Sequence, residues 1–189
     1  EALDIDIGAK LSGRLGSYTM GLLNSQMGSG QGIDSKNLSV ARVARDIQEE
    51  SSIGAMMTYG NPTANDDNGV AGVDYRYRDS NLFGSQILVA DTFFMKSFSE
   101  GIKNKDLAYG LTLNFPNDRW NAKASYKEIQ ENFKPALGFV NRSGIRQYVG
   151  EVRYRIRPRD NRYLRTINWG FESSFITSTD NELESARIF

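Results

Sequence analysis

LAYGLTLNFPNDRWNAKASY, from Leu107 to Tyr126, is the stretch of sequence that decides the fold. Apolar side chains occupy every second position before and after the central Pro-Asn-Asp, and small or polar side chains lie between them. The side chains of a strand point alternately to its two faces, so each half is predicted to be a strand with one apolar and one polar face. Proline presets φ, and Asn and Asp bond to their own backbone, so the centre is predicted to be the turn of a β-hairpin.

The same alternation recurs along the chain and predicts about ten antiparallel strands, the tenth starting at Tyr163. The predicted connections alternate in length. Short turns are predicted at residues 13–16, 48–51, 79–81, 116–118 and 158–162. Long polar loops are predicted at residues 28–37, 60–69, 95–105 and 129–145.

This alternation favours a membrane protein. Outer-membrane barrels have short turns at the periplasmic end and longer loops outside. Their strands need about 9–11 residues to cross a bilayer at a tilt, which the predicted strands provide. Residues 1–189 are therefore predicted to form a single domain, an antiparallel up-and-down transmembrane β-barrel or a fragment of a larger barrel. A secreted β-sandwich or a lipocalin-like barrel is the alternative, although nothing in a sandwich sorts its connections by length.

The composition excludes several classes of function. The 23 basic and 23 acidic residues cancel, so no charge argument favours a nucleic acid partner. The absence of Cys and His removes disulfides, thiol catalysis, the usual zinc ligands and every Ser-His-Asp arrangement. No apolar run approaches the roughly 18–20 residues of a transmembrane helix. The chain starts at Glu1 without an initiator Met or a signal peptide, so we expect a processed or excised piece.

Aromatic residues near the predicted strand ends are expected to form two belts at the membrane interfaces, where amphipathic rings are favoured. The predicted belts contain Tyr18, Tyr77, Trp120 and Tyr163 near the short turns and Tyr59, Tyr126, Tyr148 and Phe171 toward the long loops.

The polar face is expected to line the lumen. Its candidate residues are Asp74, Arg76, Lys123, Arg142, Arg146, Glu151, Arg153 and Arg155. A selective pore more often shows one dominant sign of charge, so the mixed signs favour a lattice of ion pairs inside the barrel over a selective pore wall. The arginines from Arg142 to Arg157 are the densest basic cluster. They can hold an anionic ligand or the carboxylates of a plug domain, but partners on neighbouring strands are the favoured interpretation.

Other candidate sites are weak. The oxygen-rich segment 64–69 lacks the spacing and the final Glu of an EF-hand loop, so a solvated turn is favoured over a calcium site. Glu128 with Glu131, or Glu49 with Glu50, can in principle serve glycoside hydrolysis, but nothing indicates their separation. The Gly-rich segment 28–32 has no Lys-Ser/Thr after it and is not a phosphate loop. The sequence therefore predicts no catalytic residues, no metal and no cofactor.

Residues 131–146, ENFKPALGFVNRSGIR, interrupt the alternation and carry a resemblance. Together with residues 125–129, 41–46, 51–54 and 8–14, they resemble a bacterial family of outer-membrane barrel domains of unknown function. In that family the barrel follows an N-terminal domain similar to family-9 carbohydrate-binding modules. The resemblance covers most of the chain and implies an outer-membrane location in a Gram-negative bacterium. It also implies a role in surface carbohydrate handling as a channel, receptor or anchor.

The chain departs from this family pattern in two ways. It lacks the carbohydrate-binding domain, so the resemblance assigns sugar binding to no residue of this chain. The family barrels also have more than about ten strands, so we expect further strands or subunits to complete the sheet. The expected partners are outer-membrane lipid and, through the missing domain, carbohydrate. A soluble glycan-binding β-sandwich and an outer-membrane glycan hydrolase are the alternative functions.

Overall fold

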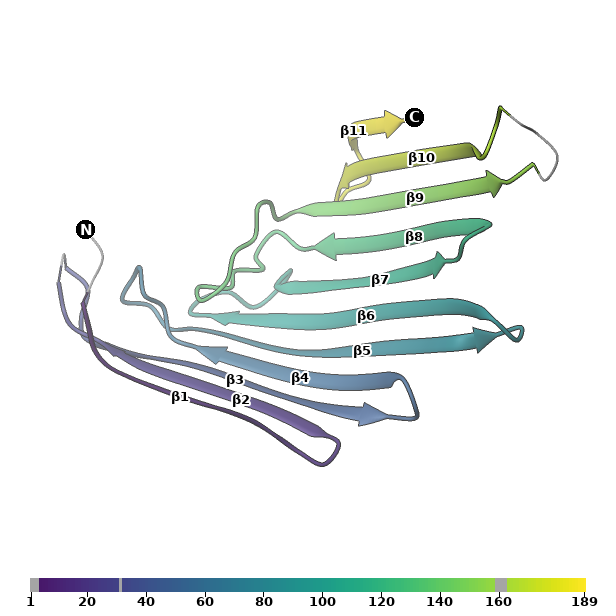
Figure 1. Ribbon diagram of the computed structural model, residues 1–189. Helices are drawn as coiled ribbons and strands as arrows, with labels where there is room; N and C mark the ends of the chain where they lie inside the picture. The colour runs from purple at the N-terminus through teal and green to yellow at the C-terminus, as the bar shows by residue number, and fades with distance from the viewer. Residues whose placement is uncertain (1–3, 31, 159–162) are drawn as a thin grey trace.

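The computed structural model describes residues 4–30, 32–158 and 163–189, which form one antiparallel sheet of eleven strands in sequence order (Figure 1). The strands are β1 Ile5–Leu15, β2 Tyr18–Met27, β3 Lys36–Ile47, β4 Ser51–Tyr59, β5 Asn68–Leu82, β6 Gln86–Ser99, β7 Leu107–Pro116, β8 Trp120–Ile129, β9 Ile145–Ile156, β10 Ile167–Ser178 and β11 Leu183–Ile188. The described residues include no helix long and apolar enough to cross a membrane.

The predicted β-hairpin from Leu107 to Tyr126 is confirmed. β7 and β8 pair in a continuous register in which Leu113 lies opposite Ala124, so the predicted apolar positions share one face. The connecting turn is held from outside the hairpin. The side chain of Asn117 accepts a hydrogen bond from the Ile87 amide (2.8 Å) and donates one to the Ile87 carbonyl oxygen (2.9 Å).

The prediction of a turn at residues 79–81 is wrong. β5 continues to Leu82 through a register shift after Asp79, and the chain reverses at residues 83–85. The Asp79 carboxylate accepts a hydrogen bond from the Asn81 amide (2.8 Å), which satisfies that backbone group within the irregular strand. Gly84, at φ +92°, supplies the left-handed conformation that the reversal needs. Phe83 therefore lies in the turn and is exposed.

The predictions also fail after β9. The predicted turn at 158–162 falls mostly outside the described residues, β10 begins at Ile167, and Tyr163 lies in the connection before it. An eleventh strand follows residues 179–182. A short turn is predicted between β9 and β10, but the connection 157–166 is longer than the next connection, 179–182. The alternation of short turns with long loops therefore ends at β9. Up to β9 the short turns lie at one end of the sheet and the long loops at the other (Figure 1). We call these the short-turn end and the long-loop end.

The two faces of the sheet differ in exposure, and apolar side chains on one face are more exposed than polar side chains on the other. Apolar residues such as Val73 and Phe94, which are paired across β5 and β6, are about half exposed. The polar residues Asp74 and Asp91 on the opposite face are less exposed than Val73. We call these two faces the apolar face and the polar face. The only buried hydrophobic residues among those described are Val70, Ala108, Phe133 and Ile145.

The sheet is open in the described residues. β1 pairs with β2 alone and β11 pairs with β10 alone, so each edge strand leaves a row of backbone groups without a strand partner. The two edges lie far apart in Figure 1. The all-β, antiparallel, up-and-down architecture is therefore confirmed, and the described strands form an open sheet.

Candidate functional site on the polar face

Ion pairs cross the polar face between strands. Arg42 on β3 donates two hydrogen bonds to the Asp74 carboxylate on β5 (2.8 and 2.9 Å), reaching across β4. Gly54 on β4 makes this possible, because a Cβ there would lie 2.7 Å from an Asp74 oxygen and 2.8 Å from an Arg42 nitrogen. Arg76 of β5 pairs with Asp91, its direct cross-strand neighbour on β6 (2.5 Å). Partners on nearby strands of the same face therefore neutralise these charges.

A second group of charges lies at the short-turn end, around the turn between β7 and β8. Asp118 accepts hydrogen bonds from both Arg155 (2.7 Å) and Arg157. Glu151 pairs with Arg153 (3.0 Å) on the same strand. The Arg157 hydrogen bond, with a smaller contribution from Arg155, lowers the pKa of Asp118 from 3.8 to about 2. The arginine cluster is thus bound by carboxylates of its own chain.

This pKa shift predicts how the β7–β8 turn responds to acid. Above about pH 5 the carboxyl is ionised whether folded or unfolded, so the Asp118 interactions contribute in full. Their contribution shrinks as the pH falls from 3.8 through about 2 and is lost only below the folded-state pKa. We expect the difference in thermal unfolding temperature between the natural protein and Asp118→Asn to be constant above about pH 5, to shrink between about pH 4 and pH 2, and to vanish near about pH 1. Circular dichroism in detergent measures it, and a difference at about pH 1 as large as that at about pH 6 contradicts the assignment.

Six of the eight predicted polar-face residues lie on that face. They are Asp74, Arg76, Lys123, Glu151, Arg153 and Arg155. Arg142 and Arg146 differ from the prediction. Arg142 lies in the 130–144 connection and pairs with Glu184 of β11. Arg146 lies opposite Glu128 on the apolar face. β9 pairs without irregularity from Ile145 to Ile156, and Arg146 lies an odd number of positions before Arg153, so these two side chains point to opposite faces.

Glu128 and Arg146 form a buried polar pair at the long-loop end of the apolar face. The Glu128 carboxylate accepts hydrogen bonds from Arg146 and from the Tyr126 hydroxyl, both at 2.8 Å, and is almost fully buried. Glu131 belongs to a different network, in which Thr179 and Lys105 donate to its carboxylate. The two carboxylates considered for glycoside hydrolysis are therefore each held by partners of their own.

The 130–144 connection folds over the polar face. Phe133 packs against Val70 of β5 and Ala108 of β7, and Val140 extends the cluster. Further half-buried members of this cluster are Phe93, Met95 and Ile129. All five strand residues of the cluster occupy polar-face positions. The predictions from sequence do not include this arrangement. The signal that could have revealed it is the set of apolar side chains at strand positions that alternation otherwise assigns to the polar face.

Hydrogen bonds hold the same loop in place. The amide of buried Asn68 donates to the Lys134 carbonyl oxygen (2.8 Å) and its oxygen accepts from the Ala136 amide (2.9 Å). Buried Ser97 accepts from the Lys134 amide (3.1 Å). Because both loop carbonyl and amide groups are satisfied by strand side chains, residues 130–144 have a defined position over the polar face at the long-loop end.

The predicted aromatic belts are reproduced in part. Tyr18, Tyr77 and Trp120 lie near the short-turn end, and Tyr59, Tyr126 and Tyr148 near the long-loop end, all on the apolar face. Phe171 lies opposite Val152, nearer the short-turn end than predicted, because β10 begins at Ile167. Tyr163 precedes that strand. Trp169, which the prediction omitted, lies opposite Tyr154, whose ring contacts Trp120 (4.5 Å between centroids).

The described residues contain no group of three or more His, Cys, Asp or Glu side chains placed to hold a metal ion, the 64–69 segment included. Comparisons with protein-family models, with curated proteins and with solved structures found no match to this chain.

Proposed function

We propose that this chain forms a membrane-spanning β-barrel, or a contiguous part of one, in the outer membrane of a Gram-negative bacterium. The observation that carries the proposal is the reversed exposure of the sheet. Large apolar side chains are exposed on the apolar face, while the ion pairs Arg42–Asp74 and Arg76–Asp91 lie on the polar face, whose long-loop end the 130–144 loop covers. Exposed apolar area in water costs about 25 cal/mol per Å². A bilayer removes that cost and suits the aromatic belts.

The stagger of the strands supports closure. Cross-strand neighbours on the apolar face run from Met20, near the short-turn end of β2, through Val73 and Phe94 to Glu128, near the long-loop end of β8. Successive cross-strand neighbours therefore move from the short-turn end of the sheet to its long-loop end, which means that the strands are staggered. Closing a sheet into a barrel requires this tilt and stagger.

The strand directions constrain how the sheet can close. In an up-and-down sheet of eleven strands, β1 and β11 run in the same direction. Direct closure would therefore make one parallel pair. Antiparallel closure needs an odd number of further strands between these edges, which agrees with the resemblance to a family of larger barrels. In the membrane every backbone polar group must be paired, so the free edges of β1 and β11 are where such strands are expected.

Within this class we propose a role in surface carbohydrate handling, as a channel, receptor or anchor for a carbohydrate-binding domain. Residues 131–146 resemble the barrel family that follows a carbohydrate-binding domain, and this resemblance supports the role in carbohydrate handling. The 130–144 loop supports a channel narrowed at the long-loop end, because it occupies the polar face there in a defined position. The expected partners are outer-membrane lipid, further strands or subunits, and carbohydrate bound outside this chain.

Gel mobility tests the proposal. The full-length protein is taken from isolated outer membranes and run in SDS with and without boiling. We expect a faster-running band without boiling, because a closed barrel resists SDS and stays compact. A protein found in the soluble fraction, or one whose mobility is unchanged by boiling, contradicts the proposal. The soluble glycan-binding β-sandwich then becomes the working hypothesis, and glycan arrays test it directly.

A further inference from the structure

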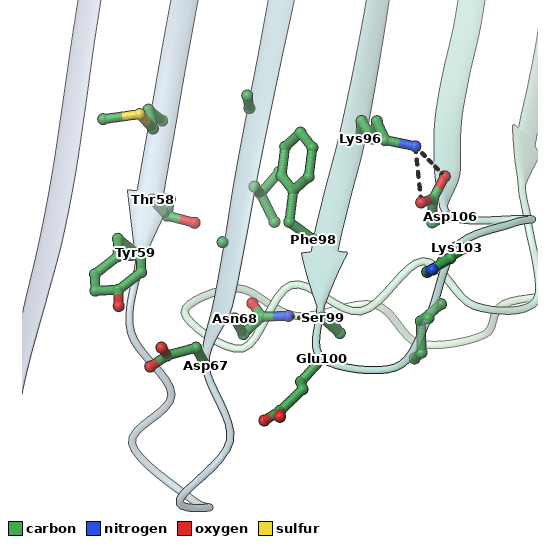
Figure 2. A pocket seen from close by; sticks show the side chains of 15 residues that line it. Thr58, Tyr59, Asp67, Asn68, Lys96, Phe98, Ser99, Glu100, Lys103 and Asp106 are labelled. Carbon is green, nitrogen blue, oxygen red and sulfur yellow. Dashed lines mark hydrogen bonds and ion pairs between the residues drawn. The ribbon is translucent and has the colours of Figure 1, made fainter.

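A groove on the apolar face runs along the start of β5, at the long-loop end of the sheet (Figure 2). Its volume is about 780 Å³. Gly69 and Ala71 of β5 form the floor, Met57 and Tyr59 of β4 form one wall, and Phe98 of β6 forms the other. All five residues are on the apolar face, so the groove opens onto the surface that we propose contacts lipid.

The floor explains the shape of the groove. Neighbouring strands lie about 4.8 Å apart, so the walls stand on backbones separated by roughly 9–10 Å. Gly69 and Ala71 place almost no side-chain volume between them. Neither floor residue has a polar side chain, and the only polar groups there are in the hydrogen-bonded backbone. A slot of this width and polarity fits a single hydrocarbon chain lying along β5.

The rim of the groove is polar and mixed in charge. Asp67, Glu100 and Lys103 are exposed and belong to the connections outside the strands (Figure 2). The Tyr59 hydroxyl lies beside the Asp67 carboxylate. Lys96 does not belong to the rim: it lies in β6 opposite Ala71 and completes the wall beside Phe98, and its ammonium group is already bound, since it donates to both oxygens of buried Asp106 (2.9 and 2.8 Å). The rim thus offers two carboxylates and one ammonium group beyond the end of an apolar slot.

We propose that this groove binds a glycolipid, with one acyl chain along β5 and the sugar head group at the rim. Carboxylates accept hydrogen bonds from sugar hydroxyls, and the ammonium group of Lys103 donates to ring and hydroxyl oxygens. The rim carries more negative than positive charge, which disfavours a wholly anionic head group. The proposal rests on the membrane-spanning function above, because the acyl chain enters from the apolar face.

The test uses the full-length protein in a zwitterionic, sugar-free detergent, with native mass spectrometry as the readout. A neutral glucosyl diacylglycerol is titrated against phosphatidylglycerol and against free maltose. We expect the glucosyl lipid to be retained at concentrations at least about tenfold below the other two. Equal retention of phosphatidylglycerol would show that the groove does not recognise the sugar head group. Equal retention of maltose would show that the acyl chain contributes nothing to binding. Either result overturns the proposal.

Two variants locate the site. Ala71→Phe fills the groove and should lower retention of the glucosyl lipid about tenfold, whereas Ala55→Phe, on the same face of β4 outside the groove, should not. Asp67→Ala with Glu100→Ala, both in exposed connections, should remove the preference for the glucosyl lipid. Unchanged retention in Ala71→Phe overturns the proposal. Gel mobility of each variant, measured alongside, reports on the barrel itself, so failure of the barrel and failure of the groove are distinguishable.

Discussion

Val73→Arg is expected to lower strongly the amount of protein that assembles in the outer membrane, where we propose that the apolar face contacts lipid. Val73 lies near the middle of β5 on the apolar face and is 53% exposed, with Ala55 and Phe94 as its cross-strand neighbours. An arginine on the lipid face of a barrel costs about 2–4 kcal/mol at the bilayer midplane. Because whole proteins are stable by only about 5–15 kcal/mol, one such charge removes a large share of the total. The measurement is the amount of SDS-resistant protein in isolated outer membranes.

Val149→Arg is the matched control. Val149 is also near the middle of its strand, but on the polar face, where its neighbours are Ser125 and Ser174. The same change there places the guanidinium among polar groups, so we expect assembly close to that of the natural protein. If both variants assemble equally well, or if Val149→Arg is the one that fails, the proposed orientation of the two faces is wrong.

Phe133→Ala is expected to release the 130–144 loop from the polar face. Phe133 is 7% exposed and is the loop side chain that packs on Val70 and Ala108. Truncating a buried Phe costs about 3–5 kcal/mol. That is more than the roughly 0.5–1.5 kcal/mol expected from each hydrogen bond that Asn68 and Ser97 make to the loop. We therefore expect hydrogen exchange of the Lys134 and Ala136 amides to accelerate by at least about a hundredfold.

Phe139→Ala provides the control within the same loop, because Phe139 is 88% exposed. Its exchange rates should match those of the natural protein. In a barrel that conducts ions, Phe133→Ala should also raise the single-channel conductance while Phe139→Ala leaves it unchanged. Exchange that stays slow in Phe133→Ala would show that the polar contacts alone hold the loop. It would also rule out the hydrophobic cluster as the cause of its position.

The strands could be predicted where alternation is continuous. The β7–β8 hairpin, the two faces of β5 and the long loops near 60–69 and 129–145 follow from side-chain period and turn chemistry. The β5–β6 reversal could not be predicted in this way. Asp79, Ser80 and Asn81 are turn formers, yet Asp79 bonds within an irregular strand and Gly84 makes the turn. The short strand β11 has little apolar alternation, and its partner β10 shifts register beside it.

The sequence by itself determined that this protein is a sheet with one apolar and one polar face, because side-chain direction in a strand depends on position alone. Tertiary structure decided what fills the polar face. Phe133, Val70 and Ala108 are distant in sequence, and only the strand register brings them under one loop. It also decided that Arg146 lies opposite Glu128. The alternation within each strand gives the face of a side chain, but the register between β8 and β9 determines which residue lies across from it.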